Sequence, residues 1–169
     1  MRFEKSIGDG LVLFWKGELS QWFKHSMTIG DVVYNCCEQY MMAQKAKLFK
    51  DEETYLKIMG TTDCWEQQNL GRQVKNFNQE VWDANCDNIV FNANFAKFQD
   101  PRLKAVLMGF GKNVVIAEAS PMDKVWGIGL GEDDPRALDR TQWIGKNRLG
   151  EALMRVQDTL FLEEMFKYD

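Results

Sequence analysis

The chain has 169 residues, 45% of them hydrophobic and 27% charged, which is enough for one compact soluble domain with a single sizeable core and short for two. Its formal net charge of −4 and its pI near 5.2 argue against binding a nucleic-acid backbone through a general positive field, although they allow a local basic pocket for one phosphate. No apolar run approaches the roughly 18 residues of a membrane helix, and the N-terminus lacks the apolar core of a signal peptide, so a cytoplasmic protein is expected.

Short strands are expected in the N-terminal part of the chain. Leu11–Phe14, Met27–Ile29 and Val32–Tyr34 are runs of β-forming residues. Gly30 and Asp31 lie between the last two runs, which is a signal for a two-residue hairpin.

The first helix is expected to begin at Asn35, as the N-cap, with Glu38 at the capping-box position. It would continue to about Phe49. Four cysteines lie in and beyond this region, and they lack the paired CxxC spacing of a zinc site, so they are expected to be reduced and packed. The single histidine, His25, is expected to lie at the surface or in a turn rather than in a catalytic triad.

Two short helices should follow. Asp51 can cap a helix that ends near Gly60, and Thr62 or Asp63 can begin another that Gly71 stops.

The remaining chain is predicted to be mainly helical, with one further strand. The apolar spacing predicts a long helix from about Asn78 to Phe98, a helix that opens at Asp100-Pro101 and ends near Gly109, a buried strand at Val114–Ala117, and a C-terminal amphipathic helix marked by Leu149, Leu153, Val156 and Leu160. The fold class is therefore α+β, a predominantly helical single domain over residues 1–169 with a small β-sheet.

Charged residues on the first helix suggest a site. Glu38, Met42 and Lys45 follow at i, i+4 and i+7, which places Glu38 and Lys45 on one stripe about 10 Å apart. The two groups could flank a ligand that lies across the helix. The alternative is a capping role for Glu38 and a solvated helix face for Lys45.

Other candidates are weaker on pattern alone. Arg72 could clamp a phosphate or be an ordinary surface arginine, and the helical phase of Trp82 favours the core over a stacking wall. Asp133 and Asp134 could attract a metal ion, but two adjacent acids without further ligands are more typical of a solvated loop.

A polar loop, Ser120–Leu130, follows the predicted buried strand. In it Asp123 and Trp126 lie where a rigid scaffold could present an acid/base group and a stacking surface to a ligand. The alternative is an ordinary exit from a strand, with a capping Asp and a core Trp.

Several ordered motifs together give a more specific signal, namely CEQYMMAQKA from Cys37, LGRxVxxF from Leu70, Trp82, EASPxDxxWGIG from Glu118 and WxGxNxLG from Trp143. In this order they resemble the YbiA/NADAR family of small N-glycosidases over about residues 11–161. One departure is Leu19-Ser20-Gln21-Trp22, where the family commonly has Leu-Ser-Asn-Phe. Because Gln has a longer reach than Asn, ligand recognition there would differ in detail.

The resemblance implies hydrolysis of the bond between a nitrogen of a base-like group and C1 of a ribose, through an oxocarbenium-like sugar. The implied substrates are phosphoribosylamino-pyrimidine intermediates of riboflavin synthesis, or ADP-ribose attached to guanine in a nucleotide or nucleic acid. On this basis the catalytic residues would be Glu38, Lys45 and Asp123, and the substrate-binding residues Tyr40, Arg72, Trp82, Ser120, Trp126 and Gly127.

The division of roles within this set stays open. Either Glu38 or Asp123 could stabilise the sugar cation and activate water, with the other acting as acid. Lys45 could protonate the leaving group or form an imine with the ring-opened sugar. Glu38 and Asp123 are expected to reach one pocket that the Lys45 ammonium faces. No cofactor or metal ion is expected. The competing hypothesis is a non-catalytic module that binds ADP-ribose or a related nucleotide, and a structural interaction domain is a third.

Overall fold

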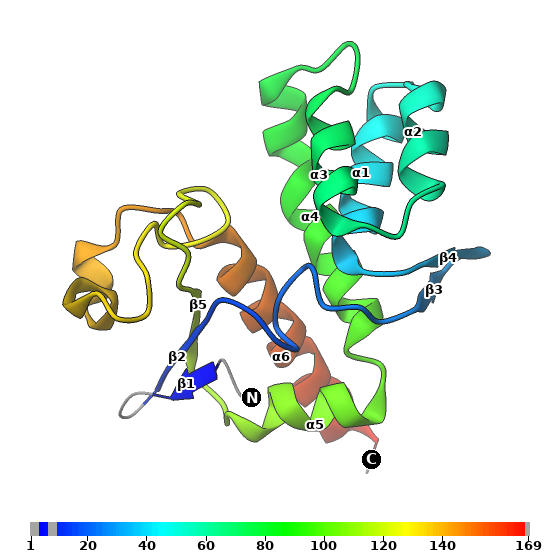
Figure 1. Ribbon diagram of the computed structural model, residues 1–169. Coiled ribbons are helices and arrows are strands. Elements are labelled where there is room, and N and C mark those ends of the chain that lie inside the picture. The colour runs from blue at the N-terminus through cyan, green and yellow to red at the C-terminus, as the bar shows by residue number, and fades with distance from the viewer. Residues whose placement is uncertain (1–3, 7–9, 168–169) are drawn as a thin grey trace. The chain divides into compact units, whose positions relative to one another are not determined.

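The computed structural model describes residues 4–6 and 10–167, shown as a ribbon in Figure 1. The chain divides into two compact units. One comprises the described residues up to Ser20 together with those from Phe98 onward, and the other is Gln21–Lys97. The combination of helices with a small sheet confirms the predicted α+β class, whereas one domain across residues 1–169 stays a prediction.

The first unit is built on a three-stranded sheet in the order β1-β2-β5, formed by Glu4–Ser6, Leu11–Phe14 and Val115–Glu118. β1 is antiparallel to β2, whereas β2 and β5 are parallel, with Phe14 opposite Glu118. Because parallel strands end at the same edge of a sheet, the chain leaves β2 and β5 side by side, and the Ala119 amide donates to the Phe14 carbonyl at 2.6 Å.

Two helices complete this unit, α5 (Pro101–Gly109) and α6 (Arg148–Phe166), and α6 packs against β5 (Figure 1). The predicted apolar stripe of α6 is fully buried, as its four leucine and valine members are 0% exposed. Gln157 Nε2 donates to the Leu107 carbonyl at 2.8 Å, which ties α6 to the end of α5. The structure adds two short 3₁₀ helices that the sequence did not predict, Pro135–Leu138 and Arg140–Gln142.

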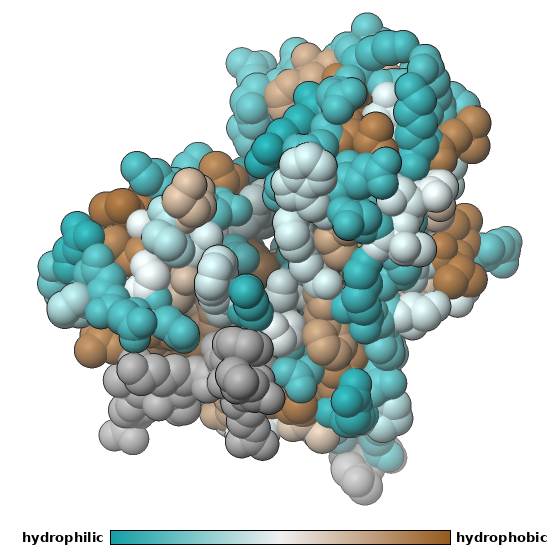
Figure 2. Space-filling view, in the orientation of Figure 1, coloured by the Kyte–Doolittle hydropathy of each residue, from teal (hydrophilic) through white to brown (hydrophobic). Residues whose placement is uncertain are grey.

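The second unit contains the four helices α1 (Cys37–Leu48), α2 (Glu52–Met59), α3 (Cys64–Arg72) and α4 (Gln79–Lys97). α1 packs against the other three. The predicted hairpin is confirmed: β3 (Met27–Ile29) pairs antiparallel with β4 (Val32–Tyr34), and Gly30 takes the left-handed turn at φ +61°. Figure 2 shows that the surface over these helices is mostly hydrophilic, interrupted by hydrophobic residues.

The expected capping box at the start of α1 is wrong by one residue. Cys36 is the N-cap, and its Sγ accepts from the Gln39 amide at 3.4 Å. The Gln39 side chain contacts the residue before this N-cap, since its Oε1 accepts from the Asn35 amide at 2.8 Å. Glu38 is therefore not used as a cap, and it lies in the first turn of the helix with only 5% of its surface exposed.

Gly71 does not end α3, contrary to the prediction, because the helix includes it and continues to Arg72. A Cβ at Gly71 would lie 1.9 Å from the Met42 sulfur and 3.3 Å from the Met42 Cβ. This glycine allows α3 and α1 to approach closely, a long-range requirement that local sequence pattern does not show. The predicted caps Asp51 and Asp63 are confirmed by their side-chain contacts to the Thr54 and Glu66 amides.

The later elements follow the predictions closely. Asp100 caps α5, with Oδ1 accepting from two amides of its first turn. On α4, Trp82, Cys86 and Val90 are buried, so the phase of Trp82 is as expected. β5 is shifted by one residue from the predicted strand.

None of the helices within residues 4–6 and 10–167 combines the length and the hydrophobicity that a membrane span requires.

Candidate functional site

Lys45 lies at the centre of a cluster of charged and aromatic side chains in the helical unit. Its Nζ is 4.6 Å from the centroid of the Phe77 ring and 5.4 Å from the centroid of the Trp82 ring. Partial burial lowers the pKa of Lys45 from its ordinary value. The ammonium thus lies beside two aromatic rings, in an environment that makes it a better acid than a solvated lysine.

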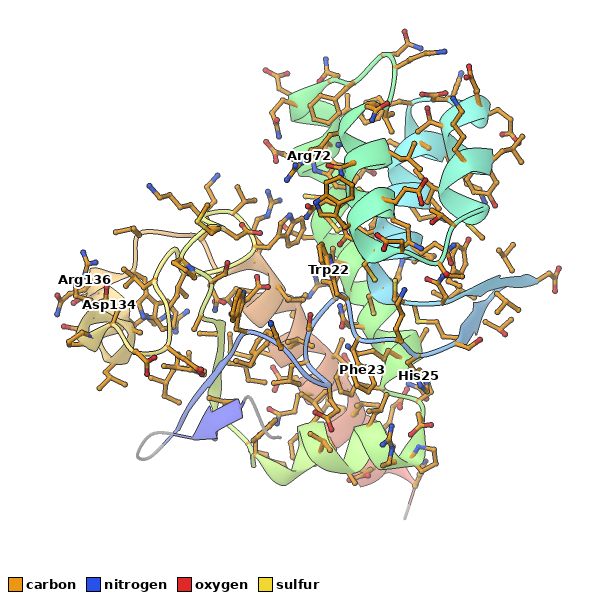
Figure 3. All side chains as sticks on the ribbon, viewed as in Figure 1. Trp22, Phe23, His25, Arg72, Asp134 and Arg136 are labelled. Carbon is orange, nitrogen blue, oxygen red and sulfur yellow. The ribbon has the colours of Figure 1, made fainter. Side chains whose placement is uncertain are left out.

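Two further charged groups act on this lysine. The Glu38 carboxylate raises the pKa of Lys45 and the Arg72 guanidinium lowers it, both less strongly than burial does. Glu38 is almost fully buried, whereas Arg72 is exposed at the end of α3 and donates to Gln68 Oε1 at 3.3 Å (Figure 3). The structure therefore brings together four of the predicted site residues, namely Glu38, Lys45, Arg72 and Trp82.

Phe77 joins this cluster, although no role was predicted for it from the sequence. The residue is 41% exposed, and its ring packs edge-on against Phe49, with ring centroids 5.3 Å apart. The available signal was its place at the end of the LGRxVxxF motif.

Tyr40 has a different environment. Tyr40 is a buried residue of α1. Its ring packs edge-on against the Tyr34 ring, with ring centroids 5.0 Å apart, and its hydroxyl interacts with the Asn92 side chain. Burial raises the pKa of Tyr40. These contacts give Tyr40 a packing role, and its expected role in stacking on a base stays a prediction.

The remaining predicted residues lie on the loop after β5, in the other unit. Asp123 Oδ1 accepts from the amides of Val125 at 2.9 Å and Trp126 at 2.8 Å. This Asx-type turn fixes the backbone that carries the Trp126 ring, which lies 5.4 Å from the guanidinium carbon of Arg148. That Glu38 and Asp123 share one pocket stays a prediction.

The loop lies close against the end of β5. A Cβ on Gly127 would lie 2.9 Å from the Glu118 carbonyl oxygen and 3.0 Å from the Asp123 carbonyl oxygen, so only glycine fits there without a shift. Ser120 is buried, and its amide donates to the same Glu118 carbonyl at 3.0 Å. Ser120 and Gly127 thus set the path of the loop, and substrate contacts by either residue stay a prediction.

Glu118, at the end of β5, is an ionisable group that the sequence analysis did not single out. Its Oε2 is buried and has no hydrogen-bond partner among the described residues. Burial, helped by the nearby Asp123 charge, raises the pKa of Glu118 to about 8. Two carboxyl groups with different environments, one protonated at neutral pH, therefore lie in the same loop region.

Two substitutions of Asp123 should distinguish the effect of its charge on catalysis from the effect of its hydrogen bonds on stability. Asp123→Asn keeps an oxygen that can accept from the Val125 and Trp126 amides, so the midpoint of thermal unfolding should stay nearly unchanged. Asp123→Ala removes this acceptor and should lower the free energy of unfolding by about 1 kcal/mol. If Asp123 acts in catalysis, kcat falls in both variants. An active Asp123→Asn enzyme would rule out a catalytic charge at this position.

Glu118 should make stability depend on pH. Because the folded-state pKa of about 8 is above the ordinary value of 4.5, the folded chain keeps a proton that the unfolded chain releases. The free energy of unfolding should therefore fall as pH rises from about 4.5 to about 8, by up to about 1.4 kcal/mol per pH unit from this group. Denaturant unfolding across this range should show a smaller fall for Glu118→Gln. The exposed Glu163→Gln should behave like wild type, and an unchanged Glu118→Gln profile would contradict the assignment.

Of the acidic pair Asp133-Asp134, the second residue has a structural role. Asp134 caps a 3₁₀ helix and pairs with Arg136 at 2.7 Å, and this partner lowers the pKa of Asp134 to about 2. Both residues of the ion pair are labelled in Figure 3. In the described parts of the chain, no group of three or more His, Cys, Asp or Glu residues is arranged to hold a metal ion.

Comparisons with known proteins place these residues in a family. The chain is 44% identical over 126 residues to N-glycosidase R617 of Acanthamoeba polyphaga mimivirus, covering 74% of each chain. It is 28% identical over 145 residues to N-glycosidase Npun_R5314 of Nostoc punctiforme, covering 85% of each. Protein irg-1 of Caenorhabditis elegans is 32% identical over 136 residues, with 79% of this chain and 64% of that protein covered.

The NMR structure of the E. coli protein YbiA has the same fold, with a TM-score of 0.77 at 24% identity, over 97% of this chain and 92% of that one. Two of the three relatives are named N-glycosidases, so the prediction of an enzyme that hydrolyses N-glycosidic bonds is confirmed at this general level. A sequence model of the NADAR domain matches residues 13–161. The chain belongs to the NADAR domain family.

Proposed function

We propose that the chain hydrolyses the bond between a ring or exocyclic nitrogen of a base-like group and C1 of a phosphorylated ribose, with Lys45 and Glu38 as its catalytic residues. The observation that carries this proposal is the environment of Lys45. Its ammonium lies beside the Phe77 and Trp82 rings, its pKa is lowered by burial, and a buried carboxylate and a guanidinium both act on it.

These groups match what the reaction requires. When the bond from nitrogen to C1 breaks, the electron pair leaves with the nitrogen, which needs a proton, and positive charge develops on the sugar. Lys45 would donate that proton, and the Glu38 carboxylate would stabilise the cation. Water then adds to C1 and gives its proton to Glu38. If Lys45 instead attacks C1 of a ring-opened sugar as the neutral amine, the bond from C1 to the base nitrogen breaks and that nitrogen leaves with the proton that Lys45 loses. Borohydride reduction would trap the imine that remains as a covalent adduct.

Arg72 supplies the contact that selects a phosphate. It is an exposed guanidinium close enough to Lys45 to influence the pKa of that lysine. One guanidinium group can donate two parallel hydrogen bonds to two oxygens of a phosphate. The partly exposed Phe77 ring offers a flat surface to a base. Because the chain has a net charge of −4, a small phosphoribosylamino-pyrimidine fits better than ADP-ribosyl-guanine within a nucleic acid.

The test uses the purified chain with each substrate in parallel. Free ribose 5-phosphate should appear from a phosphoribosylamino-pyrimidine of the riboflavin pathway, at a higher kcat/KM than free ADP-ribose from ADP-ribosyl-guanine. The competing function, a nucleotide-binding module, predicts calorimetric binding of ADP-ribose with no release from either substrate.

Activity should not need a metal ion, because Lys45 and Glu38 supply the proton and the charge stabilisation in this account. Dialysis against a chelator should leave the rate of ribose 5-phosphate release unchanged. Loss of activity that a divalent ion restores would overturn the acid/base assignment.

We also propose a cytoplasmic location. All four cysteines are free thiols, which supports this location because disulfides are rare in the cytoplasm. Fractionation of cells that express the chain tests it.

A further inference from the structure

Cys36 and Cys64 are neighbours in space, although 28 positions separate them in the sequence. Their sulfur atoms are 3.5 Å apart. Cys36 is the N-cap of α1 and Cys64 is the first residue of α3. A disulfide requires about 2.05 Å between sulfurs, so the two sulfurs would have to move about 1.5 Å closer when oxidation joins them.

The two thiols differ in access. Cys64 lines an open depression of about 460 Å³, together with Trp22, Lys24, Thr62, Asp63 and Trp65; Trp22 is labelled in Figure 3. Cys64 is 6% exposed, whereas Cys36 is 0% exposed. Of the two residues, Cys64 is therefore the one that a small solute in the depression meets first.

The two thiols also differ in charge. A hydrogen bond from Cys36 and the ammonium of Lys24 lower the pKa of Cys64 to about 7, against the opposing effects of burial and Asp63. The same hydrogen bond, together with burial, raises the pKa of Cys36. Of the two thiols, Cys64 is therefore the one that ionises more readily and is the better nucleophile.

We propose that Cys36 and Cys64 form a peroxide-reactive pair, in which Cys64 attacks the peroxide and Cys36 closes the disulfide. The Cys64 thiolate attacks one oxygen of hydrogen peroxide, the O–O bond breaks, and the departing hydroxide takes a proton from solvent to become water. The Cys36 sulfur then attacks the sulfur of the Cys64 sulfenic acid. The S–S bond forms, the S–O bond breaks, and the hydroxyl leaves with the Cys36 proton as a second water.

The disulfide would tie the start of α1 to the start of α3 and close a loop that contains α1 and α2. Because closing a loop of this length restricts the unfolded chain, the midpoint of thermal unfolding should rise on oxidation and return on reduction with dithiothreitol.

The experiment treats the reduced full chain with hydrogen peroxide, alkylates the remaining thiols with N-ethylmaleimide under denaturing conditions, and measures the intact mass and the tryptic peptides. The wild-type chain should lose two of its four alkylatable thiols and yield one cross-linked peptide pair that contains Cys36 and Cys64. Cys86→Ser, which removes a buried thiol on α4 outside the pair, should still form this cross-link.

Variants of the pair define the roles. Cys64→Ser should abolish the cross-link, whereas Cys36→Ser should leave a Cys64 sulfenic acid that dimedone labels. If Cys36→Ser does not fold, the wild-type and Cys64→Ser results decide alone. Four alkylated thiols in the treated wild type, or a cross-link through Cys37 in place of either partner, would overturn the proposal.

Discussion

Replacing Lys45 by methionine is expected to lower kcat by about a hundredfold to ten-thousandfold, the range for loss of a positioned proton donor. The chain should remain as stable as wild type or become more stable. Folding lowers the pKa of Lys45, so the charged form costs free energy in the folded state at neutral pH, and an uncharged side chain of similar length removes that cost. Steady-state kinetics and thermal unfolding of the same preparation measure both effects.

A second lysine on α1 provides the matched control. Lys47 is exposed, and its Nζ lies 4.8 Å from the Tyr55 ring, so Lys47→Met removes a lysine with an aromatic contact from the same helix. It should leave kcat unchanged. Equal losses in the two variants would show that charge on α1 in general, rather than the position of Lys45, supports activity.

Replacing Glu38 by glutamine is expected to lower kcat by a similar factor, because the amide keeps the shape of the side chain but cannot balance positive charge on the sugar. The structural cost should be limited to the loss of a helix-end charge. Glu38 is buried in the first turn of α1, where a negative charge near the helix N-terminus contributes up to about 2 kcal/mol. The free energy of unfolding should therefore fall by no more than about 2 kcal/mol.

Glu52→Gln is the control for this position, since Glu52 lies in the first turn of α2 and is exposed. It removes a comparable helix-end charge and should leave kcat unchanged. A Glu38→Gln enzyme with full kcat would exclude the carboxylate from the reaction, whatever its effect on stability.

The elements that the sequence predicted well depend on local chemistry. Asp51, Asp63 and Asp100 cap the helices that they were expected to cap, because an aspartate bonds to amides only two or three residues away. The hairpin at Gly30 is local in the same sense, since the turn geometry lies in two adjacent residues.

The predictions that were wrong or missing depend on contacts that are distant in the sequence. Gly71 serves the approach of Met42 from another helix, and Cys36 comes within 3.5 Å of Cys64 only when α1 and α3 pack. The raised pKa of Glu118 arises from burial, which no local pattern reports.

The candidate site also combines a feature that local sequence predicts with a feature that depends on distant contacts. The helical spacing of Glu38 and Lys45 predicted a shared stripe, and the structure shows that the Glu38 charge does act on Lys45. The ring of Phe77 reaches Lys45 from the segment between α3 and α4. The LGRxVxxF motif marked this residue in the sequence, whereas its contact with Lys45 depends on how the folded chain packs.

The most direct test of the account is the rate at which ribose 5-phosphate appears from a phosphoribosylamino-pyrimidine in the presence of wild type, Lys45→Met and Lys47→Met enzyme at equal concentrations. The account predicts release by wild type and Lys47→Met at the same rate, and a loss of at least about a hundredfold for Lys45→Met. Release by Lys45→Met at the wild-type rate would contradict it.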